Sequence, residues 1–455
     1  MEAPAATAPS AAPLPPEPSA GDVLRLALPA LGALAAEPLY LLVDTAVVGH
    51  LGSAPLAGLA VAGTLLTGLL AFATFLEYGT TGAVARLLGA GRRAEADDVA
   101  VQATWLAVGT GLIITLVLEL LAGPLVHLLG GGDGATTEQA TEWLRIACLG
   151  APFVCITLAG QGWLRGVQDT VTPFVVILAG NVVSAGLSIT LVYGAHMGIR
   201  GSALANAAAQ SGSAAIFALA LRRRGAPMRP NWHRAARQLA AARHLGIRTV
   251  AFLGSFTVAT GVAAHIGGPS VAAHQIALQI WSFLAFSLDS LAIAAQAMVG
   301  AAVGAGDVAR ARALGWRVIR WGAVVGAAIG ALLVAGMGVI PQLFTSDPAV
   351  LDAVHGVWPW FAAMEPAAGM VFALDGILIG AGDTRFLAYA TSVAGLGVYL
   401  PVALIAGAAG LGLPGVWAGL TCFILVRLVS CLWRMRGDHW YAAGRRHVES
   451  ALPPG

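Results

Sequence analysis

Two carboxylates stand inside an apolar stretch near the start of the chain. The stretch runs from Leu28 to Gly52 and is long enough to cross a bilayer, yet it contains Glu37 and Asp44. Their spacing of seven residues puts both close to one face of a helix. An ionisable group inside a membrane helix is costly and usually faces a protein interior or a water-filled cavity. Such a pair is suited to hold a proton or a metal cation.

Asp44 is the stronger candidate of the two for coupling to a cation. Burial disfavours the charged form of a carboxyl group, so protonation near neutral pH is expected there. Glu37 would favour protonation further through like-charge repulsion. In the second half of the chain, the residue equivalent to Asp44 is Ala259, so this acid breaks an internal symmetry described below.

Polar side chains that could assist this acid follow in two later apolar segments. Ser184 and Ser188 are four residues apart and share a helix face. They could also bond back to carbonyl groups of their own helix, which is the commoner arrangement. The full set of candidate partners in the first half is Asn181, Ser184, Ser188, Asn206 and Gln210.

The second half carries acids of its own within apolar segments. Each admits a structural explanation, such as a hydrogen bond to a neighbouring helix, beside a functional one. The candidates for a substrate or cation site there are Asp289, Gln275, Gln296, Asp375 and Glu365. In the first half, Glu77 is expected to pair with Arg86 or to reach the aqueous edge.

The composition predicts the elements that must position these residues. The chain is 58% hydrophobic and 11% charged, whereas a soluble protein would have about 25% charged residues. We therefore expect an all-α polytopic membrane protein. Apolar segments predict twelve helices, at 23–50, 55–88, 95–129, 137–166, 171–194, 199–223, 244–267, 270–303, 308–340, 349–380, 385–408 and 413–435.

The arginines predict the orientation and the domains. They follow the even-numbered helices and are nearly missing from the alternate loops. We therefore expect a plasma-membrane protein with both termini on the cytoplasmic side. The long Arg-rich loop in the middle separates two groups of six helices. The predicted units are a disordered tail (1–21), a first lobe (22–224), a loop (225–243), a second lobe (244–437) and a cytoplasmic tail (438–455).

The two halves share short motifs at a common offset of 214 or 215 residues, which indicates a duplication. Six helices per half give both halves the same orientation, as in transporters built from parallel repeats. The matched positions include Gly89-Ala90-Gly91 with Gly304-Ala305-Gly306, Pro152 with Pro366, and Asp169-Thr170 with Asp383-Thr384.

With these repeats, the chain resembles the MATE (multidrug and toxic compound extrusion) transporters, and their DinF-like branch in particular. The stretches that carry the resemblance are VDTAVVGHLG (43–52), TTGAVARLLGAG (80–91), GWLRGVQDT (162–170), GAHMGIRGSALAN (194–206), LDSLAIAAQAMVGAAVGAGD (288–307) and LDGILIGAGDT (374–384). The resemblance implies two six-helix lobes around a central cleft. It also implies an antiporter that expels organic, often cationic, compounds in exchange for H⁺ or Na⁺.

The resemblance further implies that Asp44 matches the coupling acid of the first helix. Many relatives carry Asn and Asp four apart on the fifth helix, where this chain has Ser184 and Ser188, and often a Thr where it has Asn206. Because Na⁺ favours several hard oxygen ligands and negative charge, the missing acid favours H⁺.

Other classes of protein are less favoured. The sequence has neither a GxxxxGK[ST] phosphate loop nor an HExxH motif, so we expect no enzyme activity and no cofactor besides the coupling ion. The expected partners are a small organic substrate and the bilayer, with no nucleic acid, and the expected state is a monomer. A Na⁺-coupled exporter and a lipid-linked precursor flippase remain as alternatives. The flippase would need a cationic cleft, and Arg145 is the only arginine expected well inside the first lobe.

Overall fold

The computed structural model describes residues 20–130 and 134–449; most of the predicted disordered tail (1–21) therefore lies outside the described residues. Within them the chain is helical, and twelve spans are long and apolar enough to cross a membrane. The chain is thus a multi-pass membrane protein, as predicted. The spans agree with the predicted segments apart from several ends.

The first half supplies the helices α1 (Ala20–Gly49), α2 (Ser53–Ala71), α3 (Thr74–Gly89), α4 (Arg93–Gly130), α5 (Gly134–Ala147), α6 (Ala151–Gly166), α7 (Val171–Ile189) and α8 (Ile199–Arg223). The second half supplies α9 (Trp232–Ile266), α10 (Gly268–Gly304), α11 (Val308–Gly336), α12 (Pro348–Gly380), α13 (Thr384–Ser392), α14 (Leu400–Ala408), α15 (Gly412–Arg436) and α16 (His439–Glu449).

Several predicted spans are divided into two helices by a short irregular segment. A three-residue 3₁₀ turn, Cys148–Gly150, separates α5 from α6 just before Pro152. A π-helical turn, Val393–Tyr399, separates α13 from α14. Pro401 lacks the N–H that would bond four residues back, so the widened turn before it accommodates the lost bond.

The loop between the halves is shorter than predicted. Helix α9 begins at Trp232, inside the segment 225–243 that was expected to be a loop. The side chain of Asn231 accepts a hydrogen bond from the Arg234 N–H (3.1 Å) and caps the helix. Hydropathy marks only the part of a helix that crosses lipid, so a charged extension rich in Ala and Arg is missed. For the same reason the predicted C-terminal tail contains α16.

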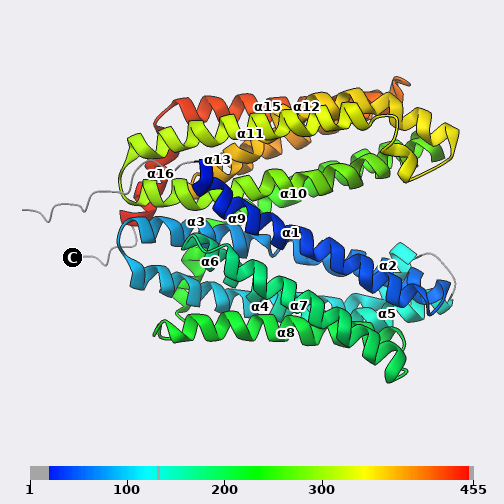
Figure 1. The fold of residues 1–455 in the computed structure, drawn as a ribbon, viewed down its shortest axis with the longest axis horizontal. Helices are drawn as coiled ribbons and strands as arrows, with labels where there is room; N and C mark the ends of the chain where they lie inside the picture. The colour runs from blue at the N-terminus through cyan, green and yellow to red at the C-terminus, as the bar shows by residue number, and fades with distance from the viewer. Residues whose placement is uncertain (1–19, 131–133, 450–455) are drawn as a thin grey trace, which may run out of the picture.

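The helices form two lobes, and α1 spans both (Figure 1). Near its start, Val23 and Leu26 belong to the apolar core of the second lobe. Near its end, Val48 belongs to the core of the first lobe. Pro29 and Pro38 lie within the helix between these two anchoring regions. Helix α1 is therefore a physical link between the lobes.

At one end of the molecule the lobes are closed against each other. Helix α3 of the first lobe packs on α10 and α12 of the second. A Cβ atom added to Gly89 would collide with the carbonyl oxygen of Ala301, and one added to Gly304 would collide with that of Arg86. The two copies of the repeated Gly-Ala-Gly motif thus end the helices that cross at this seam, where their missing side chains let the backbones touch.

We expect Gly304→Ala to destabilise the closed arrangement by about 1–3 kcal/mol, because the methyl group has no room at the seam. Gly109→Ala on α4 is a matched control, because nothing lies within 4 Å of the added Cβ. This control should be neutral or slightly stabilising, since Ala favours a helix by roughly 0.5–1 kcal/mol. Thermal unfolding of the purified variants measures both, and equal midpoints would show that the seam is not tightly packed.

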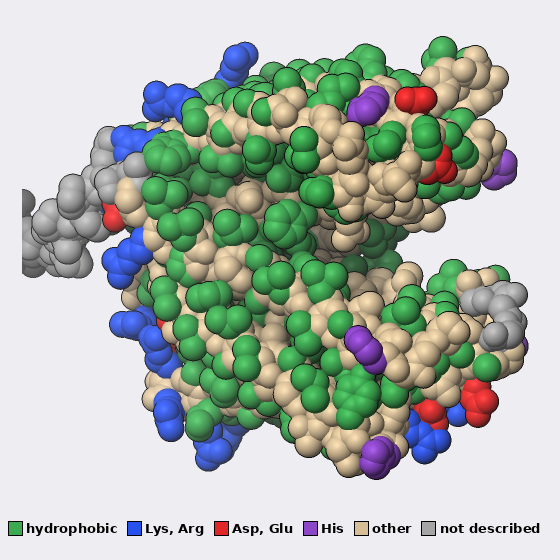
Figure 2. All heavy atoms as spheres, turned by 45° about the vertical axis from the view of Figure 1, so that its right-hand side comes forward, with side chains coloured by type: hydrophobic (Ala, Val, Ile, Leu, Met, Phe, Trp, Pro, Cys, Tyr) green, Lys and Arg blue, Asp and Glu red, His purple; other side chains and the backbone are tan. Residues whose placement is uncertain are grey.

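The opposite end of the molecule is open. Figure 2 shows a deep hollow between the lobes, which narrows toward the end where arginine side chains gather. That Arg-rich end carries the last turn of α8, with Arg222 and Arg223, and the last turn of α15, with Arg434 and Arg436. The seam of α3 with α10 and α12 therefore closes the Arg-rich end, and the cleft opens away from it.

Candidate functional site

Asp44 is enclosed by hydroxyl groups from two other helices of the first lobe. Ser188 of α7 donates to Asp44 Oδ1 (3.0 Å), and Ser202 of α8 lies 2.9 Å from both carboxylate oxygens. Trp143 Nε1 of α5 donates to the Ser202 hydroxyl (3.2 Å), which orients it. The Asp44 side chain is buried at 2% exposure. The carboxyl group therefore lies in a buried polar pocket, and no basic side chain of the described residues bonds to it.

A second group of polar contacts lies one helical turn before Asp44. The Tyr40 hydroxyl accepts a hydrogen bond from Ser184 (2.9 Å) and lies 3.4 Å from the amide nitrogen of Asn206. The two predicted serines of α7 therefore bond to α1 rather than to their own helix. The same three helices, α1, α7 and α8, hold both groups.

The local sequence explains why α7 presents these serines inward. Most side chains near Ser184 and Ser188 are exposed, including Val182, Val183 and Ile189. The two serines are buried because their four-residue spacing puts them on the narrow strip that faces α1 and α8. A strip of small polar residues on an otherwise apolar helix is the feature that brings the hydroxyls to the acid.

Three contributors to this pocket were not predicted from the sequence: Tyr40, Ser202 and Trp143. Two of them had a usable signal. Tyr40 precedes Asp44 by four residues, and Ser202 precedes Asn206 by four, so each shares a helix face with a predicted residue. Trp143 lies on a different helix, α5, and its approach depends on packing that sequence spacing does not reveal.

Glu37 and Asp44 lie on the side of α1 that meets α7, and no direct contact joins the two among the described residues. Glu37 is exposed, whereas Asp44 is buried. Glu37 lies against Asn181 of α7, and the side chains of the two residues interact. Gln210 is partly buried on α8 and makes no contact with the Asp44 carboxylate. Glu37 and Asp44 therefore both face α7, although one is exposed and the other is buried.

Three of the second-lobe candidates, Asp289, Gln296 and Asp375, lie around Tyr78 and Arg248, whereas Gln275 and Glu365 lie elsewhere. Tyr78 of α3 donates to Asp289 Oδ2 of α10 (3.0 Å), and Gln296 donates to the Tyr78 carbonyl (2.6 Å). Both bonds cross between the lobes at the seam. Gln275 is exposed and precedes Gln296 on the same helix by about 30 Å, given the rise per residue.

Asp375 and Glu365, both on α12, have opposite surroundings. Asp375 accepts from Arg248 (2.7 Å) and from Arg427 (2.6 Å to each oxygen), so two cations share one carboxylate. Glu365 is fully buried, and neither of its oxygens has a hydrogen-bond partner in the described part of the chain. The five predicted residues of the second lobe therefore do not form one site.

Two expectations about arginines were wrong. Glu77 pairs with Arg165 of α6, whereas Arg86 donates to the Gly380 carbonyl oxygen of α12 (2.7 Å). Arg86 and Arg165 are the buried arginines of the first lobe, and Arg145 is exposed. The prediction failed because arginines at helix ends were assigned to the aqueous face, although helix packing encloses these two.

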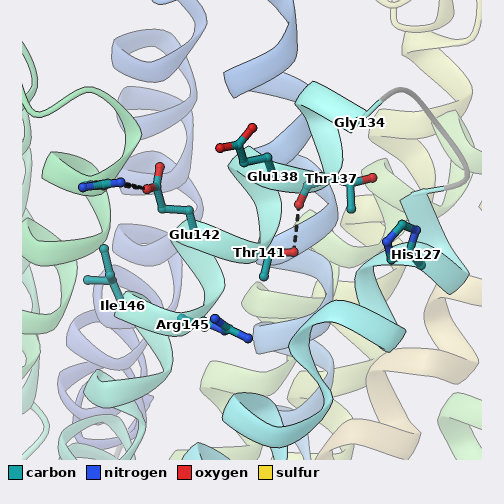
Figure 3. Close-up of a pocket in the computed structure, with 9 residues that line it drawn as sticks. His127, Gly134, Thr137, Glu138, Thr141, Glu142, Arg145 and Ile146 are labelled. Atoms are coloured by element: carbon teal, nitrogen blue, oxygen red, sulfur yellow. Dashed lines mark hydrogen bonds and ion pairs between the residues drawn. The ribbon is translucent and has the colours of Figure 1, made fainter.

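A separate cavity of about 620 Å³ lies in the first lobe at the end opposite the Arg-rich one, near the start of α5. Figure 3 shows Glu138, Glu142 and Arg145 around it, with Thr141 bonded to the Thr137 carbonyl (2.8 Å). Arg200 of α8 pairs with Glu142. Ion pairs partly neutralise the charges that line this open cavity. None of its lining residues bonds to Asp44. Across the residues that the structure describes, no group of three or more His, Cys, Asp and Glu side chains is arranged to hold a metal ion.

The comparison with known families decides the classification. The MatE family model matches the chain twice, at residues 29–190 and 245–405, once in each half. The chain belongs to the MatE family. The double match agrees with the duplication seen in the sequence, and the members of this family are transporters rather than enzymes.

Individual relatives agree with this membership. Protein DETOXIFICATION 44, chloroplastic, of Arabidopsis thaliana is 33% identical over 92% of this chain and 84% of its own length. DNA damage-inducible protein F of Escherichia coli (strain K12) is 31% identical over 92% of this chain and 93% of its own. A solved structure described as the outward-facing conformation of a multidrug resistance MATE family transporter superposes with a TM-score of 0.79, at 22% identity over 95% of this chain and 96% of that one. These likenesses confirm the fold of this MATE protein and the DinF-like resemblance.

Proposed function

We propose that this MATE protein is a secondary active antiporter that exports organic, cationic or amphipathic compounds in exchange for protons. The observation that carries the proposal is Asp44, a buried carboxyl group held by two hydroxyl donors. A carboxyl group in such a pocket can be neutral when it is protonated and tolerated as an anion through its hydrogen bonds. The Asp44 carboxyl group can therefore both take up and release a proton.

Helix α1 provides the link from proton binding to movement of the lobes. Ser188 and Ser202 hold its later half in the first lobe through Asp44. Its first half is packed in the core of the second lobe through Val23 and Leu26. Protonation changes the hydrogen bonds that Asp44 accepts. Pro38 lies between the part of α1 held in the first lobe and the part packed in the second. We infer that α1 bends there when Asp44 changes its charge, which favours one arrangement of the lobes over the other.

The Na⁺-coupled alternative has weaker support. A sodium ion prefers several oxygen ligands with negative charge, and Asp44 is the one carboxylate in the described pocket. Both serine hydroxyls direct their hydrogens at that carboxylate, so they would have to turn before they could coordinate a cation. A proton bonds to one carboxylate oxygen and needs no further ligands. Beyond the coupling ion, we propose a plasma-membrane location with both termini cytoplasmic and a monomeric state.

The ion can be tested in proteoliposomes loaded with a fluorescent organic cation. An imposed pH gradient, in the absence of sodium, should drive movement of the cation, and a sodium gradient at equal pH on both sides should not. Addition of a protonophore should remove the effect of the pH gradient. Movement that follows the sodium gradient and ignores the protonophore would overturn proton coupling.

A further inference from the structure

A cavity of about 590 Å³ lies between the lobes at the Arg-rich end, on the far side of the seam from the open cleft. Helices α3 and α4 of the first lobe form one wall, and α9, α12 and α13 of the second lobe form the rest. This volume is within the range of pockets that bind small organic ligands, roughly 300–1,000 Å³. None of the groups that hold Asp44 lines it.

The cavity has an apolar part and a charged part. Phe75, Leu76 and Leu245 line the apolar part, which lies further along α3 and α9 from the Arg-rich end. Arg234 and Arg237, one helical turn apart near the start of α9, line the charged part. A ligand that fills the cavity therefore needs both an apolar chain and a polar head.

The charges that line the cavity leave a positive excess. Asp98 pairs with Arg234 (2.7 Å), and Glu95 pairs with Arg92, so both acids are neutralised. Arg237 is exposed and forms no ion pair or hydrogen bond with another described residue. Arg86 is buried and bonds to carbonyl oxygens of α12 but to no acid in the described part of the chain. The head group that these two arginines favour is an anion.

We propose that this cavity binds an anionic amphiphile, a phospholipid with its phosphate at Arg237 and an acyl chain along Phe75, Leu76 and Leu245. Arginine recognises phosphate oxygens through paired N–H donors. An acyl chain replaces the water that would otherwise cover the apolar part. Because the cavity has walls from both lobes, the bound lipid contacts both and stabilises the closed seam.

The site is separate from the proposed exchange of protons, so its test does not depend on transport. The full chain is purified in a neutral detergent, and its thermal unfolding midpoint is measured with three probes. Phosphatidylglycerol supplies the phosphate and chains, phosphatidylcholine supplies chains with a zwitterionic head, and glycerol 3-phosphate supplies the head without chains. We expect phosphatidylglycerol to raise the midpoint by about 3 °C near saturation and the other two probes to leave it unchanged.

Two variants and a control test the position of the lipid. Arg237→Gln should raise the concentration of phosphatidylglycerol needed for half of the shift by about tenfold, because the phosphate loses its free cation. Arg243→Gln is the matched control, since this arginine is exposed on the same helix and does not line the cavity. Ala241→Trp should fill the space from an exposed wall position and remove the shift although Arg237 remains.

Each alternative outcome overturns the proposal in a different way. An equal shift with phosphatidylcholine would show that the cavity does not select an anion. An equal shift with glycerol 3-phosphate would show that it takes a free phosphate group and no chain. Equal effects of Arg237→Gln and Arg243→Gln would place the lipid elsewhere on the basic surface.

Discussion

Replacement of Asp44 by Asn is expected to reduce pH-driven transport in proteoliposomes to the level of protein-free vesicles. Asn has the same size, and its amide oxygen can accept the hydrogen bonds from Ser188 and Ser202. The pocket should therefore keep its shape, and the variant should be expressed and folded like the wild type. The amide cannot bind and release a proton near neutral pH, so the proton gradient no longer has a group through which to act.

Asp352→Asn is the matched control for this variant. Asp352 is exposed on α12, so the same charge is removed away from the pocket. Its transport rate should equal that of the wild type. If Asp44→Asn retained full pH-driven transport while the control did too, Asp44 would have no role in coupling, and the account of α1 would fail with it.

Asp375→Asn is expected to have the largest effect on stability. The change leaves Arg427, whose side chain is only 3% exposed, without its ion-pair partner, and among the described residues it leaves Arg248 with only Asp289, to which it is not bonded, as a compensating charge. Loss of one partner from a buried ion pair typically costs about 3–5 kcal/mol. Thermal unfolding in detergent should show a marked fall in the midpoint, because the two remaining cations repel each other and Arg427 is almost fully buried.

The double variant Asp375→Asn, Arg248→Met separates this explanation from a general loss of packing. Removal of one arginine relieves the repulsion, so the double variant should be more stable than Asp375→Asn alone. Asp352→Asn, on the same helix, should change stability by less than about 0.5 kcal/mol. A double variant that is less stable than the single one would show that the arginines do not repel each other in this way.

The sequence was sufficient for the main features of the fold. Long apolar segments predicted twelve membrane helices, because a helix needs about 20 apolar residues to cross the bilayer. Motifs repeated at a constant offset predicted two equivalent halves, because a duplication leaves the same turn residues in both copies. The errors lie where this logic ends. Helix α9 extends into water from Trp232, where hydropathy gives no signal.

The candidate site could be predicted only in part. Asp44 and Ser188 share a pocket because each is a polar residue on an apolar helix, and such residues tend to meet in the interior. The approach of Ser202 and Trp143 depends on how α5 and α8 cross, which no local pattern contains. Asp289 and Asp375 could be singled out as acids within apolar segments, yet their partners Tyr78, Arg248 and Arg427 come from distant parts of the chain.

Proton movement driven by the substrate is the most direct test of coupling through Asp44. Vesicles that contain the protein and a pH-sensitive dye are loaded with an organic cation and diluted into medium without it. The account predicts that the outflow of cation draws protons into wild-type vesicles in a fixed ratio, and that neither movement occurs with Asp44→Asn. Outflow of the cation through the wild-type protein without any change in internal pH would contradict it.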